Sequence, residues 1–319
     1  MTSTHLVVAL LLAGAVAVPH LLPLQRVAPA SAVAVWFLAL CLRAISACLA
    51  AVYLLVYLPQ THTFAAVSDW CLNLPLPDAV LHMPGLAVAD IATSLPALAL
   101  VGSLLTATWL LVRARLHARR LLAQLAIGNG PMGSTVLAGD GIVVAVTRTG
   151  PARLLVSGAA LTTLDNEELN AGLHHELGHV RRSHRPVMFA ASLMRALARW
   201  QPGASAAYRE LCFSLERDAD EYALGQTRNP LALASAICKA AAGQAAAAPV
   251  LGLQGGSRVA LRLEYLIAGG RPPAGTVMEQ ATKLLAVAML GLTLFLAVAA
   301  PSWALAHGFA LPPLSAAHC

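Results

Sequence analysis

The stretch AGLHHELGHVRRSH, residues 171–184, stands out in a chain that is otherwise rich in Ala, Leu and Val. On a helix, residues four apart share one face, so His175 and His179 would present their imidazoles side by side. This is the spacing at which two imidazoles bind one zinc ion, and Glu176 between them can reach a water molecule at that metal. The stretch therefore predicts a helix that carries part of a zinc site.

A second polar group follows in the sequence ERDAD, residues 216–220. Glu216 and Asp220 are four residues apart, again on one face of a predicted helix. A catalytic zinc ion takes three protein ligands and keeps an open position for water, so Glu216 would complete a site with His175 and His179. Asp220 would accept a hydrogen bond from a ligand imidazole and fix its tautomer. Alone, ERDAD would be read as a solvated acidic face paired with neighbouring arginines; beside HELGH, the metal site is favoured.

The segments around these motifs predict a mainly helical α+β domain. Aliphatic and β-branched runs at 141–148 and 152–161, separated by a TGP turn, predict a β-hairpin. Thr163 or Asp165 can cap the helix that carries HELGH, and Pro186 marks its expected end. Further helices are predicted at 204–224 and 257–268, with a low-complexity loop between them at 240–256.

The composition indicates a membrane protein. Of the 319 residues, 58% are hydrophobic and only 11% are charged, far below the usual quarter for a soluble domain. Four stretches are long and apolar enough to cross a bilayer, at about 5–24, 36–58, 95–112 and 284–305. These spans predict an N-terminal membrane region at 1–112, a zinc metallopeptidase domain at 113–283, and a C-terminal span with a short tail at 284–319.

The basic residues predict which side of the membrane each segment faces. All of the 21 Lys and Arg except Arg26 and Arg43 lie between Arg113 and Lys283. By the positive-inside rule, residues 113–283 are cytoplasmic, while 59–94 and the C-terminal tail are outside. The net charge is +6, but the basic residues are not interleaved with aromatic residues that could stack on bases. The sequence also matches no nucleic-acid-binding module, so we expect no direct nucleic-acid binding.

Three polar residues outside the motifs allow more than one interpretation. Arg43 lies inside the second span, and we expect it to extend toward the inner face rather than to line an ion pathway. His174 points about 100° away from His175 and is expected to pack or to face solvent. His184 follows in a basic run and is expected at the surface. The six scattered cysteines form no CxxC pair, so they indicate neither a disulfide framework nor a Cys-based zinc site.

HELGH at 175–179 followed by ERDAD at 216–220 resembles the membrane-embedded gluzincin metallopeptidases. These include the HtpX-like and CAAX prenyl protease family, in which the second motif reads E-x-x-A-D, and the related BlaR/MecR antibiotic-sensor family. The arrangement of three spans, a zinc domain and a fourth span is similar to BlaR/MecR. Only about 14 residues follow the last span, so the penicillin-sensing domain of that family has no counterpart in this sequence.

The resemblance implies a role for each motif residue and a fold for the domain. It implies a zincin-like fold with one Zn²⁺ per chain, held by His175, His179 and Glu216. Glu176 would be the general base toward the water that zinc activates, and Asp220 would orient a ligand imidazole. The strand at 141–148 resembles the edge strand on which such proteases pair an extended substrate. An oxyanion-stabilising residue is also implied, and the candidates are Tyr208, Tyr222, His184 and Arg217.

The sequence thus predicts a membrane-anchored zinc endopeptidase that cleaves proteins at the cytoplasmic face of the membrane, in a bacterial plasma membrane as the resemblance implies. Two roles fit this activity: quality control of membrane proteins, and cleavage of a cytoplasmic transcriptional repressor in signalling. A catalytically silent zinc-binding scaffold is a different class of function. It is disfavoured because structural zinc sites are usually closed by four ligands, whereas here three ligands accompany Glu176. A small transporter that uses Arg43 is a weaker alternative.

Overall fold

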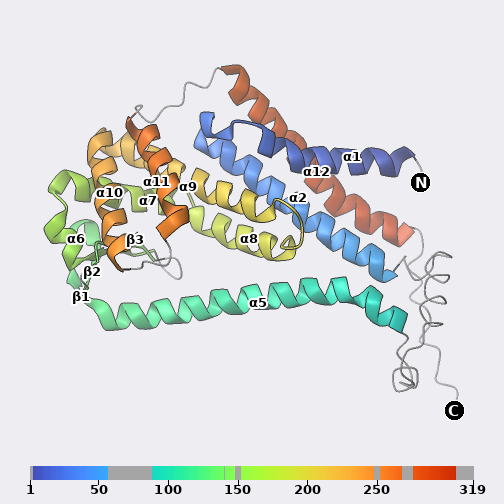
Figure 1. The fold of residues 1–319 in the computed structure, drawn as a ribbon, viewed down its shortest axis with the longest axis horizontal. Helices are drawn as coiled ribbons and strands as arrows, with labels where there is room; N and C mark the ends of the chain where they lie inside the picture. The colour runs from blue at the N-terminus through green and yellow to red at the C-terminus, as the bar shows by residue number, and fades with distance from the viewer. Residues whose placement is uncertain are drawn as a thin grey trace, which may run out of the picture.

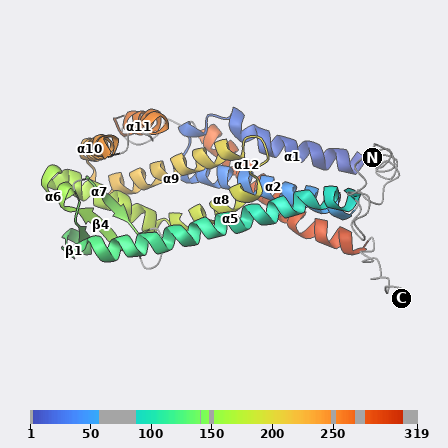
Figure 2. The same ribbon diagram turned by 60° about the horizontal axis from the view of Figure 1, so that its bottom comes forward.

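The computed structural model describes residues 3–56, 88–139, 141–147, 152–247, 252–267 and 276–306. These residues are mostly helical and include one small four-stranded sheet. Long helices lie side by side over much of the molecule, and the sheet gathers with shorter helices at one end (Figure 1). The second view shows the same elongated arrangement (Figure 2).

Three helices are long and apolar enough to cross a membrane, which indicates a membrane protein. They are α2 (Pro29–Val56), α5 (Val88–Leu125) and α12 (Thr276–Ala306), with candidate spans at Pro29–Leu55, Thr93–Leu125 and Val277–Ala299. Large apolar side chains on α5 and α12 are exposed, as lipid-facing side chains would be; they include Leu98, Leu105, Leu290, Phe295 and Val298. The predicted spans at 36–58, 95–112 and 284–305 fall on these helices, except that 57 and 58 lie outside the described residues.

The first predicted span, 5–24, corresponds to helix α1 (Ser3–Leu21), which precedes a short 3₁₀ turn, η1 (Leu24–Arg26). The part of α1 whose side chains are described is apolar from Leu10 to Leu21, which is shorter than a bilayer requires. Helix α1 packs against α2. It is a helix, as predicted, but it is not among the three candidate spans found in the described part of the chain.

Arg43 is held inside the helical bundle and is only 1% exposed. Its guanidinium donates to the backbone carbonyls of Ala39, Val16 and Pro202, and lies 2.9 Å from Nε2 of His20. Arg43 is therefore enclosed by the protein and does not extend to solvent. Carbonyl groups satisfy its donors within the protein, which favours a structural role that ties α1 and a distant loop to α2.

The sheet has the strand order β1-β2-β4-β3. Its strands are β1 (Ala126–Asn129), β2 (Thr135–Leu137), β3 (Val144–Val146) and β4 (Leu154–Ser157). The predicted hairpin is confirmed as the antiparallel pair β3–β4, although most of its turn lies outside the described residues. Strands β1 and β2 were not predicted; β1 follows α5 directly and pairs antiparallel with β2, and β2 runs parallel to β4.

The end of the second predicted strand is instead helical. Ser157 accepts a hydrogen bond from the amide of Ala160 and so begins helix α6 (Gly158–Thr163). Asp165 then caps helix α7 (Asn166–Arg181), and the reciprocal bond from Asp165 N to Glu168 completes a capping box. Asp165 is therefore the cap that the sequence left open between two candidates.

Two further sequence expectations are wrong in part. Helix α7 does end before Pro186, but a new helix, α8 (His184–Leu197), begins at once and holds Pro186 in its first turn, where an amide donor is not needed. The predicted loop at 240–256 is mostly the end of α10 (Pro230–Ala247) and the start of α11 (Gly252–Ile267), with 248–251 outside the described residues. Alanine is the strongest helix former, which explains why this Ala-rich segment continues the helix.

Helix α9 (Ala204–Thr227), predicted at 204–224, connects the two parts of the molecule. Toward its beginning it packs with α8 against α2, and Leu211 and Leu215 share one buried core with α2 and α12. Its later turns contact α7, which in turn packs on β3 and β4. The junction of α7 and α9 is where both sequence motifs lie.

Candidate metal centre

Helices α7 and α9 approach each other closely at Gly178. A Cβ atom placed on Gly178 would lie 3.2 Å from Cα and from the carbonyl oxygen of Ala219. Only glycine allows this approach without displacing backbone, so the third residue between His175 and His179 sets the separation of the helices. The close contact brings the polar face of α7 against Glu216 and Asp220 on α9.

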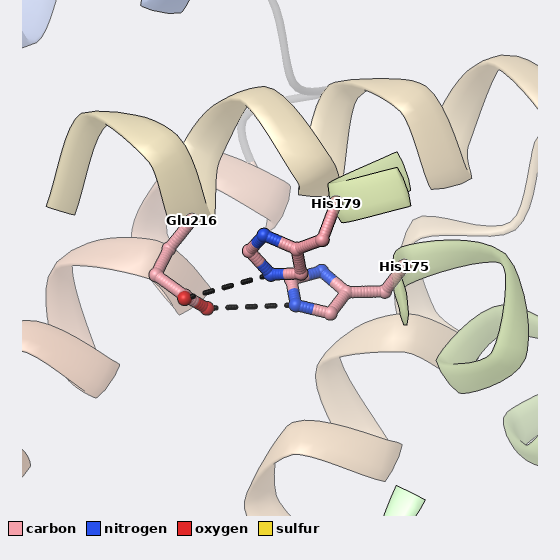
Figure 3. A group of neighbouring side chains, drawn as sticks. All are labelled: His175, His179 and Glu216. Carbon is pink, nitrogen blue, oxygen red and sulfur yellow. Dashed lines mark ion pairs between the residues drawn. The ribbon is translucent and has the colours of Figure 1, made fainter. Parts of the chain in front are cut away.

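His175, His179 and Glu216 converge at this contact (Figure 3). Nε2 of His175 lies 3.5 Å from one oxygen of the Glu216 carboxylate, and Nε2 of His179 lies 3.6 Å from the other. One ligand atom from each of the three residues falls within 4.8 Å of the others. The group could therefore hold a metal ion.

The donor set and its spacing fit zinc. Two ligand atoms about 2.1 Å from one tetrahedral ion lie about 3.4 Å apart, close to both measured separations between the imidazoles and Glu216. Two imidazoles and one carboxylate are a typical set for catalytic zinc, which leaves a fourth position open. Glu216 remains 39% exposed, so the group is reachable from outside.

Asp220 lies behind His175. Nδ1 of His175 is 2.8 Å from Oδ1 of Asp220, which has no exposed side-chain surface. The two atoms lie at hydrogen-bond distance, but the N–H of His175 is poorly aligned with the Asp220 oxygen. The contact is therefore a close ion pair. Burial disfavours the charged imidazole, but Asp220 and Glu216 outweigh burial and raise the pKa of His175 to about 10. Without metal, His175 is thus a cation between two carboxylates.

Arg262, on α11, completes the charge balance on this side and was not singled out from the sequence. Its Nε and Nη2 donate to the two oxygens of Asp220 at 2.9 and 2.8 Å, and Nη1 lies 3.1 Å from Glu216. Burial would lower the pKa of Arg262, but the charges of Asp220, Glu216 and Glu176 raise it above its ordinary value. Arg262 thus neutralises carboxylates on two helices.

His184 lies behind the second imidazole and is 3% exposed, so the expectation that it is a surface residue is wrong. Its Nδ1 is 2.9 Å from Nδ1 of His179, and its Nε2 is 2.8 Å from Oδ2 of Asp218. Arg182 also donates to Asp218, at 2.9 Å. A carboxylate takes a proton donor, so His184 presents Nδ1 as the acceptor to His179 Nδ1–H. That assignment leaves the Nε2 lone pair of His179 directed at the metal group.

The protonation of the remaining ligands already suits a metal ion. Burial, together with the positive charges of His175 and Arg262, lowers the pKa of His179 to about 4 despite the opposing charge of Glu216. Burial would raise the pKa of the Glu216 carboxyl, but the neighbouring His175 and Arg262 hold it well below its usual range. At neutral pH, His179 is neutral and Glu216 is ionised, as metal ligands must be.

The structure also places the other residues named from the sequence. Glu176 is half-buried on α7 beside His175, near enough to Arg262 for its charge to act there. His174 is bonded to the carbonyl of Asn170 on its own helix and is not part of the group, as predicted.

Three of the four candidates for oxyanion stabilisation are engaged elsewhere. His184 binds Asp218; the Arg217 guanidinium lies over the Tyr265 ring; and the Tyr208 hydroxyl is 3.2 Å from Ser192 Oγ. Tyr222 lies beside Gly178 at the helix contact.

Comparison of the chain with protein-family models, with curated proteins and with solved structures found no match. The resemblance to gluzincin metallopeptidases therefore rests on the sequences HELGH and ERDAD alone.

Proposed function

We propose that this chain is a membrane-anchored zinc endopeptidase, with His175, His179 and Glu216 as the zinc ligands. The observation that carries the proposal is the convergence of two imidazole Nε2 atoms and one carboxylate at ligand spacing, from helices far apart in the sequence. Each of the two imidazoles has a polar partner at its other ring nitrogen, Asp220 for His175 and His184 for His179. This supports a metal site, since ligating histidines almost always have such partners.

The residues of the chain can be given separate tasks in peptide hydrolysis. Zinc held by such ligands acidifies a bound water molecule and polarises a carbonyl group. Glu176, next to His175 and outside the ligand set, would take the proton from the attacking water and pass it to the leaving amine. Asp220 and the His184–Asp218 pair hold the two imidazoles in place. Arg262 keeps the carboxylates of the buried Asp220 and the partly exposed Glu216 ionised.

The position of strand β3 at the edge of the sheet supports the proposal that the substrate is a polypeptide. Strand β3 is the last strand of the described sheet on one side and packs against α7, where Val144 is 3.7 Å from the position of a Cβ on Gly172. Val143 and Thr147 bond toward β4, so the amides of Val144 and Val146 point to the open side. An extended peptide pairing there would be held by main-chain bonds close to the helix of the metal group.

The membrane helices support a location at the bilayer. We place the domain on the cytoplasmic side because most basic residues of the chain lie in it. The family resemblance suggests that the membrane is a bacterial plasma membrane. Substrates would then be membrane proteins or cytoplasmic proteins that reach this surface.

The direct test measures metal content and casein cleavage for detergent-purified wild type and Glu176→Gln. We expect zinc in both proteins and cleavage by the wild type only, because Glu176 is not a ligand. His174→Ala is the matched control, since His174 lies on the same helix outside the metal group, and it should behave as wild type.

Two results would contradict the proposal. Wild type that holds no zinc after metal-replete purification would refute the metal site. Zinc in both proteins with no cleavage of casein or of a membrane-protein substrate panel would point to the silent zinc-binding scaffold.

A further inference from the structure

A helical hairpin that reaches past the metal centre lies along a candidate membrane span. Helices α8 and α9 run side by side, joined by the loop 198–203, and both pack against α2 (Figure 1). Their buried residues share one apolar core with α2 and α12, including Ala191 on α8 and Ala207 on α9. The part of the hairpin nearest its tip therefore packs with the candidate membrane helices α2 and α12.

The hairpin tip is bonded to residues deep in α2. Gln201 donates to Ser46 Oγ at 2.9 Å, and the Pro202 carbonyl accepts from Arg43 at 3.4 Å. Gly203, in the left-handed conformation, lies so close to Arg43 that a Cβ there would be 3.0 Å from Nη2. Polar groups from the tip and from the middle of α2 thus form one cluster.

Helix length places this cluster inside the bilayer. If Ser46 lay outside the membrane on the inner side, only about ten described residues of α2 would remain to cross, or about 15 Å. The hydrocarbon core is about 30 Å thick, so a span that ends near Val56 must include Ser46. Whatever touches Ser46 then shares its depth.

The exposed surface of the tip suits lipid. Trp200 is 70% exposed, and the Arg199 guanidinium lies over its ring at 5.0 Å from the centroid. An indole ring is largely apolar and is stabilised among acyl chains, and a long Arg side chain can extend from there toward the headgroups. In water, by contrast, the indole would be a large apolar surface covered only by the Arg199 guanidinium.

We propose that the tip of the α8–α9 hairpin is inserted into the inner half of the bilayer, with Trp200 in contact with lipid. The inserted tip also shields the Arg43 guanidinium from the hydrocarbon, since the Pro202 carbonyl covers one of its donors. The proposal depends on α2 crossing the membrane and not on peptidase activity.

Nitroxide accessibility tests the insertion. Single cysteines at Trp200, Leu98 and Gln226 are spin-labelled in a cysteine-free background and reconstituted at low density in vesicles of phosphatidylcholine and phosphatidylglycerol. Leu98 is an exposed residue of α5 within its apolar span, and Gln226 is an exposed residue at the opposite end of α9. Oxygen concentrates among acyl chains, and a nickel chelate stays in water.

We expect the label at 200 to resemble that at 98, with loss of nickel collisions and strong oxygen collisions, while 226 shows the reverse. A label at 200 that collides with nickel as freely as at 226 would overturn the insertion. A label shielded from both probes would also overturn it, because protein would then cover the tip.

If the cysteine-free background does not fold, p-benzoylphenylalanine in place of Trp200, with the native cysteines kept, reports the same contact by the mass of a lipid adduct. Each of these outcomes leaves the zinc and cleavage assays unaffected, so the two proposals fail separately.

Discussion

The Nδ1 atoms of His179 and His184 lie 2.9 Å apart, and the Nε2 atom of His184 lies 2.8 Å from Oδ2 of Asp218. His184→Ala would leave His179 free to rotate and to change tautomer. We expect zinc affinity to fall by about 10–100-fold, as for other partners of ligating histidines. Competition with a chelator of known affinity measures the change.

His184→Asn tests whether the hydrogen bond itself matters, because the amide can accept from His179 and donate toward Asp218. This variant should recover part of the affinity that His184→Ala loses. Equal affinity in wild type, His184→Ala and His174→Ala would show that the His179–His184 contact has no influence on the site.

Zinc binding should release about one proton at a pH between 6.5 and about 10. In that window metal-free His175 is protonated, because its folded pKa is raised to about 10, whereas His179 is already neutral and Glu216 already ionised. Calorimetry in buffers of different ionisation enthalpy counts the protons. Asp220→Asn removes a partner that raises the pKa of His175, so it should release fewer.

The raised pKa of His175 also makes the stability of the metal-free protein depend on pH. A raised pKa means that the stabilising contribution of charged His175 is complete below 6.5 and is lost as the pH rises through about 10. The thermal midpoint of metal-free protein should therefore decline over this range more steeply in wild type than in His175→Gln. An identical decline in both would contradict the protonation assigned to His175.

Gly178→Ala should weaken both the fold and the site. The added methyl group would meet the backbone of Ala219 at 3.2 Å and push α9 from α7, at a cost of about 1–3 kcal/mol. Glu216 would move away from the imidazoles, so zinc content should fall too. Gly172→Ala is the matched control, because its methyl would only touch Val144 at 3.7 Å. Equal loss in both variants would refute the role of the close approach.

Arg262→Gln should destabilise the metal-free protein strongly. Asp220 and Glu216 would then be balanced only by the His175 cation, and removing one partner of a buried ion pair costs about 3–5 kcal/mol. Zinc supplies positive charge to the same group, so it should raise the thermal midpoint more in this variant than in wild type. Glu264→Gln, at an exposed position of the same helix, is the control. An unchanged thermal midpoint of the metal-free variant would show that Arg262 does not stabilise the two carboxylates.

Val146→Pro tests substrate pairing on β3. The outward amide of Val146 is lost, whereas the bonds of Val143 and Thr147 to β4 remain. We expect a higher KM for a protein substrate with unchanged zinc content. Unchanged KM would argue against pairing of the substrate at this edge.

The sequence predicted the residues of the site better than their surroundings. HELGH and ERDAD each place two groups on one helical face, a local relation that helix geometry alone determines. Arg262 and the His184–Asp218 contact depend on how separate helices pack. No spacing within α11 shows which of its turns meets Asp220, and a basic run conceals a buried histidine. Asp218 sits between the two motif residues Glu216 and Asp220, and it faces a different partner.

The fold was predicted where the pattern is long and was missed where it is short. Apolar runs of about 20 residues identified α2, α5 and α12. Strands β1 and β2 are only four and three residues long, too short for alternation to show. Helix α8 was missed because Pro186 was read as a stop, although it occupies the first turn of a new helix.

Helix α9 contains neither proline nor glycine between the hairpin tip and Glu216, a stretch of about 20 Å. A helix without such residues is stiff, so a displacement of its first turn would also move Glu216. A thinner or thicker bilayer that shifts the tip would act as a lever on the carboxylate opposite the two imidazoles. The spacing of the metal ligands and the thickness of the surrounding membrane would then be mechanically coupled.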